Sequence, residues 1–572
     1  MRILVFVCLA WGAISCGTSP TDKAAPSSSL SQPTLTDYAV ASAHPLATQA
    51  GIDILRQGGN AFDAAVAVTA CLAVVEPYAS GLGGGGFWLL HTASDGRDIM
   101  LDGREVAPLA ATQDMYLDDA GRPTRKSVVG PLAAGIPGLP AALVHLSDRY
   151  GRLPLDLTLH AAIRHAHEGF EVSARYQRLA TAVLDHLHET AGGTSVFLEQ
   201  GSVPEPGYVL RQPQLARVLE RIRDEGADGF YRGEVAALLV QGVQQAGGIW
   251  QMQDLEQYRV RERKPVSGTY ANMKVTSAAL PSSGGIVLMQ MLNMLSLLDL
   301  SQIEVTQRTH ALVEVMRRAY VDRARYLGDT DHVEVPVQRL LSAQHATRML
   351  ADFNPNQASP SSAYLKQPAG LQGGEPAEGR NTTHFSVIDR EGNYIAATLS
   401  INYPFGSGFV PPGTGILLNN EMDDFSIKPG HSNLYGLTGN RANAIEAGKR
   451  MLSSMSPTFL DDGERVAILG TPGGSRIITM VLLAALEFVR GGDASAMVSR
   501  PRFHHQFVPD HIEFEDGAFD AATLSALAGL GHTLQATSRS YGDMHAVIWN
   551  RKTGHVTAAS DPRGLGLAQV GE

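Results

Sequence analysis

The most constraining feature of this sequence is an abrupt change of character at residue 381. The stretch 352–380 is rich in Pro, Gly, Ser, Gln and Asn, a composition typical of an exposed segment. Two strand patterns follow, His384–Asp389 and Tyr394–Asn402, and the short turn between them contains glycine, so a β-hairpin is expected. An exposed segment that leads directly into a hairpin suits a chain that is cut at this junction.

Thr382, at the start of this hairpin, is a candidate nucleophile. A cut after Asn381 would leave a hydroxyl and a free α-amine on Thr382, and an amine with a pKa of about 7.7–8.0 can serve as general base for that hydroxyl. The expected pairing places Ile401 opposite Thr382, with the polar Ser400 and Asn402 on either side, and a one-residue bulge would put one of these two on the same face as Thr382. Asn381 also fits the N-glycosylation pattern. Two threonines at the start of a strand usually have no catalytic role, so evidence from the rest of the chain is needed to show whether Thr382 is a nucleophile.

The overall composition is that of a globular protein with a large core. The 572 residues are 44% hydrophobic and 18% charged. A net charge of -11 and the lack of any basic run argue against binding to nucleic acid.

The N-terminus resembles a bacterial export signal. An apolar run, 3–13, follows a short basic start and is too short to span a bilayer. The small residues before Cys16 resemble a lipobox, with plain periplasmic secretion as the alternative. We expect an export signal at 1–16, a flexible tether at 17–36, and a location in the periplasm or cell envelope of a bacterium, with lipid on Cys16.

The cysteines predict a mature chain without an internal disulfide. Cys8 would leave with the signal and Cys16 would carry lipid. Cys71 then remains, in an apolar helical run, and is expected to be a buried small hydrophobe rather than a reactive thiol.

Helical patterns dominate the chain before residue 352. Two helices are expected within 44–77, the second capped by Asn60. Further helices are expected at 215–224, 235–246, 284–298 and 305–326.

Two ligand-binding patterns are rejected. The run Gly83–Gly86 leads into a strand and no Lys-Ser/Thr follows, so it is not a nucleotide loop. His504 and His505 would point to opposite faces of a strand, and with His511 no carboxylate spacing completes a site, so no metal is expected.

A series of short motifs runs in order from about residue 38 to the C-terminus. They are Gly58–Ala65, Gly81–Phe87, Asp102–Glu105, Pro281–Gly285, Asn381–His384, Gly415–Phe425, Ser453–Thr458, Thr471–Arg476 and Asp561–Gly564. Each is weak alone, but together they resemble the γ-glutamyltranspeptidases, also called glutathione hydrolases.

This resemblance implies an α+β fold of the N-terminal-nucleophile hydrolase type, a four-layer αββα sandwich. It implies self-cleavage before Thr382 into a large subunit, 37–381, and a small subunit, 382–572, which form one shared domain as a heterodimer. The γ-glutamyl group of glutathione or a similar compound would form an acyl-enzyme on Thr382. Water, or the amine of an amino acid or dipeptide, would then accept it. No cofactor is implied, and membrane contact would be only through lipid on Cys16.

The resemblance also implies how the donor is held. A γ-glutamyl donor carries an α-carboxylate and an α-ammonium, and a buried site must pair both charges. The matching positions are Arg104, Ser453 and Ser454 for the carboxylate, and Asn402, Glu421 and Asp424 for the ammonium.

Further positions match the chemistry of acyl transfer. Gly473 and Gly474 match a backbone N–H pair for the oxyanion. Thr383 and Ser400 match hydroxyls that orient the nucleophile; many relatives have threonine in place of Ser400, and activity is expected to survive. The stretch 428–450 resembles a lid loop, with an ordinary surface loop as the alternative.

Two other functions stay open. A glutaryl or cephalosporin-type acylase of the same fold would act on donors without an α-amino group, for which Glu421 and Asp424 would be idle. A non-catalytic envelope lipoprotein would remain a single, uncut chain.

Overall fold

The computed structural model describes residues 35–300, 303–364, 381–428 and 430–571. The predicted export signal, Cys16 and all but the end of the predicted tether lie outside this range. Within it, no helix is long and apolar enough to cross a membrane.

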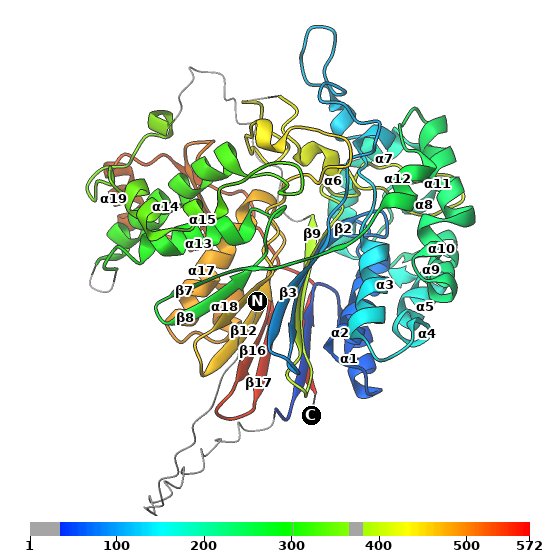
Figure 1. Cartoon of the computed structure of the whole chain (residues 1–572), viewed down its shortest axis with the longest axis horizontal. Coiled ribbons are helices and arrows are strands. Elements are labelled where there is room, and N and C mark those ends of the chain that lie inside the picture. The colour runs from blue at the N-terminus through cyan, green and yellow to red at the C-terminus, as the bar shows by residue number, and fades with distance from the viewer. Residues whose placement is uncertain (1–34, 301–302, 365–380, 429, 572) are drawn as a thin grey trace, which may run out of the picture.

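Two antiparallel sheets pack face to face at the centre of the molecule (Figure 1). In order across the first sheet, the strands are β18 (Leu567–Gly571), β1 (Tyr38–Ser42), β9 (Thr382–Ile388), β10 (Tyr394–Ser400), β2 (Gly85–Thr92), β3 (Arg97–Gly103) and β6 (Arg261–Arg263). Across the second they are β17 (Val556–Ser560), β16 (His545–Asn550), β12 (Arg465–Gly470), β11 (Thr458–Asp461), β8 (Met273–Ser277) and β7 (Val266–Tyr270).

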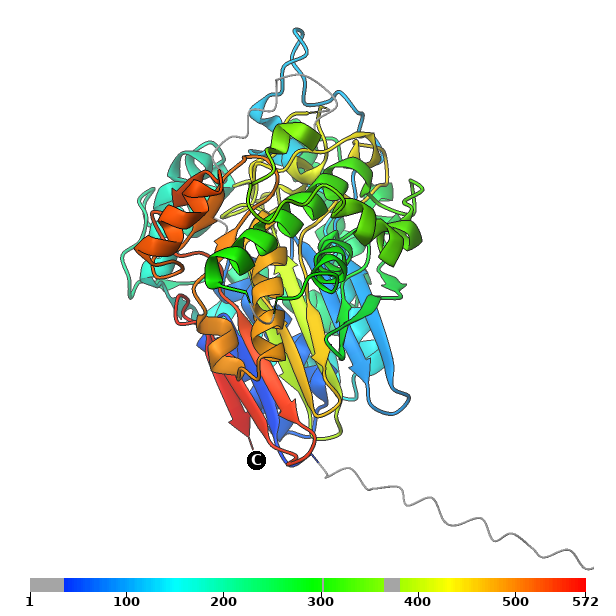
Figure 2. The same cartoon turned by 90° about the vertical axis from the view of Figure 1, so that its left-hand side faces the viewer.

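Helices cover both outer faces of this pair of sheets. The first sheet is covered by a group that includes α1 (Pro45–Arg56), α2 (Ala61–Val75), α3 (Leu139–Tyr150), α5 (His160–Glu168), α9 (Pro213–Glu225) and α11 (Gly233–Gln245). The second is covered by α13 (Gly284–Leu295), α14 (Val305–Tyr326), α17 (Ile477–Val489) and α18 (Ala494–Ser499), which face the viewer in Figure 2. The predicted α+β class and four-layer αββα arrangement are confirmed, and the predicted helices all form.

The central strands are buried on both faces, which explains their continuous apolar runs. In β2, Trp88 and Leu90 belong to the core beneath the α1–α2 layer, whereas Phe87 and Leu89 belong to the core shared with the second sheet. Alternate side chains on a strand point to opposite faces, so a four-layer fold needs apolar residues at every position here.

Both sheets take strands from either side of residue 382. In the first sheet β9 pairs with β1 on one edge and with β10 on the other. In the second sheet β11, from the later part of the chain, pairs with β8 from the earlier part. A cut before Thr382 would therefore leave two pieces that share one core.

The predicted hairpin forms, but its register differs by one residue from the prediction. Thr382 lies opposite Ser400 instead of Ile401. The reason is that Asp389 belongs to the turn rather than to the strand: its N–H donates to Asn393 O at 3.0 Å, and its carboxylate accepts from the N–H of Asn393, also at 3.0 Å. The longer turn places Ser400 beside Thr382 without a bulge.

Helix α2 is entirely buried and lies directly against β9 and β10. Asn60 is its N-cap, as predicted: Oδ1 accepts from the N–H groups of Phe62 and Asp63, each at 2.9 Å. Asn60 Nδ2 also donates to Tyr150 O at 2.7 Å. Cys71 in this helix is fully buried, also as predicted, and burial raises the pKa of its thiol to about 12.

We expect Asn60→Ala to lower the free energy of unfolding by about 1–2 kcal/mol, because the cap of a buried helix is lost. Chemical denaturation measures the change. Asn60→Ser keeps an acceptor for the same N–H groups and is expected to lose less than half as much. An equal loss in both variants would show that the cap is not the cause.

Candidate active site

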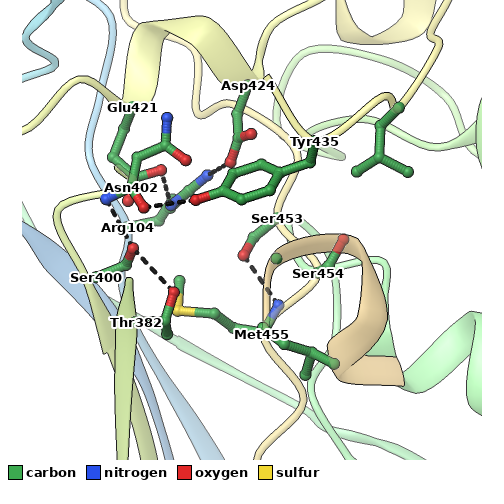
Figure 3. Close-up of a pocket in the computed structure, with 13 residues that line it drawn as sticks. Arg104, Thr382, Ser400, Asn402, Glu421, Asp424, Tyr435, Ser453, Ser454 and Met455 are labelled. Carbon is green, nitrogen blue, oxygen red and sulfur yellow. Dashed lines mark hydrogen bonds and ion pairs between the residues drawn. The ribbon is translucent and has the colours of Figure 1, made fainter. Parts of the chain in front are cut away.

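A single pocket brings together most of the predicted site residues (Figure 3). Those that line it are Arg104, Thr382, Ser400, Asn402, Glu421, Asp424, Ser453, Ser454 and Gly474. They come from the end of β3, the β9–β10 hairpin, the turn Glu421–Asp424, and the segments before β11 and α17. Residues far apart in sequence therefore meet where the hairpin opens.

The two hydroxyls of the β9–β10 pair face each other. Thr382 Oγ1 lies 3.3 Å from Ser400 Oγ, and both side chains are buried. The N–H of Asn402 donates to Ser400 Oγ at 2.8 Å. Asn402 has φ 73°, a left-handed conformation that asparagine tolerates better than most residues, and it ends the strand beside Ser400.

Thr383 does not line the pocket. Neighbouring residues of a strand point to opposite faces, and Thr383 Oγ1 instead donates to Glu76 Oε2 at 2.7 Å. Glu76 also accepts from Tyr78 OH at 3.1 Å, and burial raises the pKa of its carboxyl. The predicted contact of Thr383 with the nucleophile stays a prediction. Glu76 was missed because nothing near it in sequence marks it as a partner for a strand 307 residues away.

Arg104 is buried and is held between two carboxylates. Its Nη1 donates to Glu421 Oε2 and its Nη2 to Asp424 Oδ2, each at 2.6 Å, while Nε donates to Met451 O at 3.2 Å. Glu105 Oε2 lies 3.5 Å from Nη1. Arg104 was predicted to bind the α-carboxylate of a donor, and Glu421 and Asp424 its α-ammonium. In this structure these side chains neutralise one another.

Burial sets the protonation of the carboxyls around Arg104. It raises the pKa of Glu421 to about 7, with Arg104 lowering it and Asp424 raising it. Burial and the neighbouring Glu421 raise the pKa of Glu105 well above its usual range. Burial also raises the pKa of Asp423 to about 6, although the N–H of Leu434 and the hydroxyl of Ser127 donate to it.

The segment that contains Ser453 and Ser454 is anchored by residues of the helical layer that covers the second sheet. Arg323, near the end of α14, donates from Nη2 to Ser454 Oγ at 3.1 Å and from Nε to Ser283 Oγ at 3.0 Å. Ser283 Oγ donates in turn to Ser453 O at 2.6 Å. Arg323 is buried, and its contact positions Ser454.

The Gly473–Gly474 turn joins β12 to α17. Gly474 has φ 56° and its Cα packs against the ring of Tyr435: a Cβ there would lie 2.4 Å from the ring. Gly473 has φ 152°, and a Cβ there would lie 2.4 Å from Met480 Cε. Gly474 lines the pocket and Gly473 does not, so the use of both N–H groups stays a prediction.

Tyr435, from the stretch predicted to be a lid, lines the pocket. Its hydroxyl donates to Asn402 O at 2.6 Å, and its backbone O accepts from Gln506 Nε2 at 3.0 Å. Asn433 Nδ2, two residues earlier, donates to Asp424 Oδ1 at 2.9 Å. The pocket has a volume of about 20 Å³, room for about one water molecule. A larger ligand therefore requires some of the lining side chains to move.

The histidines considered in the sequence bond to other side chains. His504 bonds to Thr479 and Gln506, and His505 to Asp510. Among the described residues, His310, Glu314 and His532 lie close enough to hold a metal ion, their ligand atoms being within 4.8 Å of one another. Glu314, however, is ion-paired with two arginines of its own helix, which disfavours a cation there.

Comparison with known proteins gives a consistent answer. A family model described as gamma-glutamyltranspeptidase matches residues 47–570. The chain belongs to the gamma-glutamyltranspeptidase family. It is 41% identical over 532 residues to the glutathione hydrolase proenzyme of Escherichia coli, covering 92% of this chain and 90% of that protein.

Solved structures share this fold. A cephalosporin acylase from Bacillus halodurans matches with a TM-score of 0.80 and 27% identity, covering 96% of this chain and 98% of that one. The gamma-glutamyltranspeptidase of Helicobacter pylori matches with a TM-score of 0.55 and 37% identity, covering 57% of this chain and 96% of that one. The predicted N-terminal-nucleophile hydrolase fold is confirmed, and this member of the gamma-glutamyltranspeptidase family is an enzyme with γ-glutamyltransferase function.

We expect Asp423→Asn to stabilise the protein at pH 7.5 but not at pH 4. The folded state holds a proton on Asp423 up to about pH 6, whereas an unfolded chain releases it near pH 3.9. Between these values the folded state binds more protons, so the wild-type free energy of unfolding falls as pH rises. At pH 7.5 the variant should gain roughly 1–3 kcal/mol, measured by chemical denaturation. A gain of the same size at both pH values would contradict this cause.

Proposed function

We propose that the chain is a self-processing glutathione hydrolase and γ-glutamyltransferase with Thr382 as nucleophile. The observation that carries this proposal is the position of Arg104 between Glu421 and Asp424, in the pocket that also holds the Thr382–Ser400 pair. This arrangement has the charge pattern that an α-amino acid end requires.

A zwitterion can enter this cluster without leaving a charge unpaired. Its α-carboxylate replaces a carboxylate on Arg104, and its α-ammonium takes the carboxylate that is released. A glutaryl group brings only the carboxylate, so it must compete with Glu421 and Asp424 for Arg104 and leave one of them unpaired. Because an unpaired buried charge costs several kcal/mol, the cluster favours the γ-glutamyl donor.

The proposed reaction uses the new N-terminus of Thr382. Its α-amine takes the proton from Oγ1, which attacks the γ-carbonyl of glutathione or a similar compound. Backbone N–H groups of Gly473 and Gly474 stabilise the oxyanion, and the leaving amine takes the proton. Water, or the amine of an amino acid or dipeptide, then releases the γ-glutamyl group from Thr382.

The subunits and location are also proposals. We propose an export signal at 1–16 with lipidation at Cys16, and a tether at 17–36 that leads to the envelope or periplasm of a bacterium. Cleavage gives a large subunit, 37–381, and a small one, 382–572. The strand pairings across residue 382 would hold these subunits together as a heterodimer.

The purified protein should run as two bands on a denaturing gel, and N-terminal sequencing of the smaller band should begin at Thr382. Thr382→Ala removes the hydroxyl that attacks, so this variant should stay a single chain. A wild-type protein that remains uncut would instead support a non-catalytic lipoprotein.

The charge cluster predicts that γ-glutamyl anilide is a better substrate than glutaryl anilide, by roughly 100-fold or more in kcat/KM. Steady-state kinetics on both anilides measure this ratio. Asp424→Asn removes one carboxylate that competes for Arg104, so it should lower γ-glutamyl turnover and narrow the ratio. Equal or better turnover of the glutaryl substrate by the wild type would favour the acylase function.

A further inference from the structure

Cleavage before Thr382 needs a base that is not the α-amine. Until the bond between Asn381 and Thr382 breaks, that nitrogen is an amide and cannot accept a proton from Oγ1. The hydroxyl of Thr382 must therefore lose its proton to another group, and the uncut chain described here is the state in which that group has to be in place.

The titratable side chains that line the pocket narrow the choice. Arg104 is permanently charged. Tyr435 already donates its proton to Asn402 O. Asp424 uses one oxygen for Arg104 and the other for Asn433. Glu421 differs from all of these.

Glu421 has one carboxylate oxygen to spare. Oε2 accepts from Arg104, but Oε1 is buried and has no hydrogen-bond partner. The hydroxyl of Ser400 lowers the pKa of the Glu421 carboxyl, although no hydrogen bond joins the two side chains in the uncut chain. Both residues line the pocket beside Thr382, and Figure 3 shows Ser400 between Thr382 and Asn402, on the same side as Glu421.

The hydrogen bonds of Ser400 give this contact a direction. Its oxygen accepts from the N–H of Asn402, which leaves one lone pair and one hydrogen. If the hydrogen points to the acceptor Glu421, the remaining lone pair is free for the hydroxyl of Thr382, 3.3 Å away. The chain of donors then runs from Thr382 through Ser400 to Glu421.

We propose that Glu421, acting through the hydroxyl of Ser400, accepts the proton of Thr382 during self-cleavage, before the residue takes up its role in donor binding. This inference rests on the proposed cut between Asn381 and Thr382. Glu421 would serve twice: as proton acceptor in the uncut chain, and as partner of the donor ammonium once the α-amine of Thr382 exists.

The step balances without any group other than water. The proton of Thr382 passes to Ser400 as the proton of Ser400 passes to Glu421, and Oγ1 bonds to the carbonyl carbon of Asn381. The C–N bond then breaks, and the nitrogen takes back the proton by the same route, leaving an ester and a free amine. Water hydrolyses the ester to give the Asn381 carboxylate and the Thr382 hydroxyl.

The surroundings of Glu421 suit a base that works near neutral pH. Burial raises its pKa to about 7, so it is a stronger base than an exposed carboxylate yet is largely ionised above that pH. The charged and titratable groups that face it are Arg104, Glu105, Asp424 and Tyr435. Of these, only Arg104 favours the ionised form.

The test follows the conversion of newly synthesised full-length chain into two pieces on denaturing gels, between pH 5.5 and 8.5. In the wild type the rate should rise about tenfold per pH unit up to about pH 7 and then level off. Glu421→Gln should cleave roughly 100-fold more slowly or worse, without that rise.

A second pair of variants keeps the test independent of how Glu421→Gln folds. Ser400→Ala leaves the carboxylate in place but removes the relay, so its cleavage should slow by a similar factor, and Ser400→Thr should restore it. Wild-type cleavage rates in Glu421→Gln or Ser400→Ala, or a wild-type rate that does not depend on pH, would overturn the inference. A wild-type chain that is not cut before Thr382 would overturn the proposed function itself.

Discussion

The pairing of β9 with β1 and β10 is the constraint on which the site depends. β9 pairs with β1 along residues 385–388 and with β10 along its whole length, and the pairing with β10 places Thr382, its first residue, opposite Ser400. Because strands from both sides of residue 382 build each sheet, a cut before Thr382 breaks one covalent bond but none of these pairings. The fold can therefore tolerate a cut at its centre, and the cut turns a fixed strand start into a fixed N-terminus.

The second organising feature is a set of buried charges that remain paired without a ligand. Arg104 bonds to Glu421 and Asp424, and Asp424 also holds Asn433, two residues before Tyr435. In the proposed function, entry of a zwitterionic donor would exchange ion pairs instead of creating them, which would limit the desolvation cost. The same exchange would disturb the contact between Asp424 and Asn433, and so would link donor binding to the position of Tyr435.

Much of the fold could be read from local signals. The cap at Asn60, the apolar periodicity of α14 and the hairpin after residue 381 depend on residues close in sequence, and each forms as predicted. The hairpin register was wrong by one residue, because the side chain of Asp389 closes a longer turn. Hydrogen bonds of that kind are decided by side-chain geometry, which pattern and composition do not reveal.

The sequence by itself determined the fold class, the family motifs and the candidate residues, because these follow from local periodicity and from short runs of residues with fixed spacing. Only the tertiary structure decided which groups meet: Thr383 with Glu76, Arg323 with Ser454, Tyr435 over Gly474, and Ser400 with Thr382. The physical reason is that these contacts join segments tens to hundreds of residues apart or, for Ser400, depend on register. Burial then sets the protonation of Glu421, and burial is a property of the packed molecule alone.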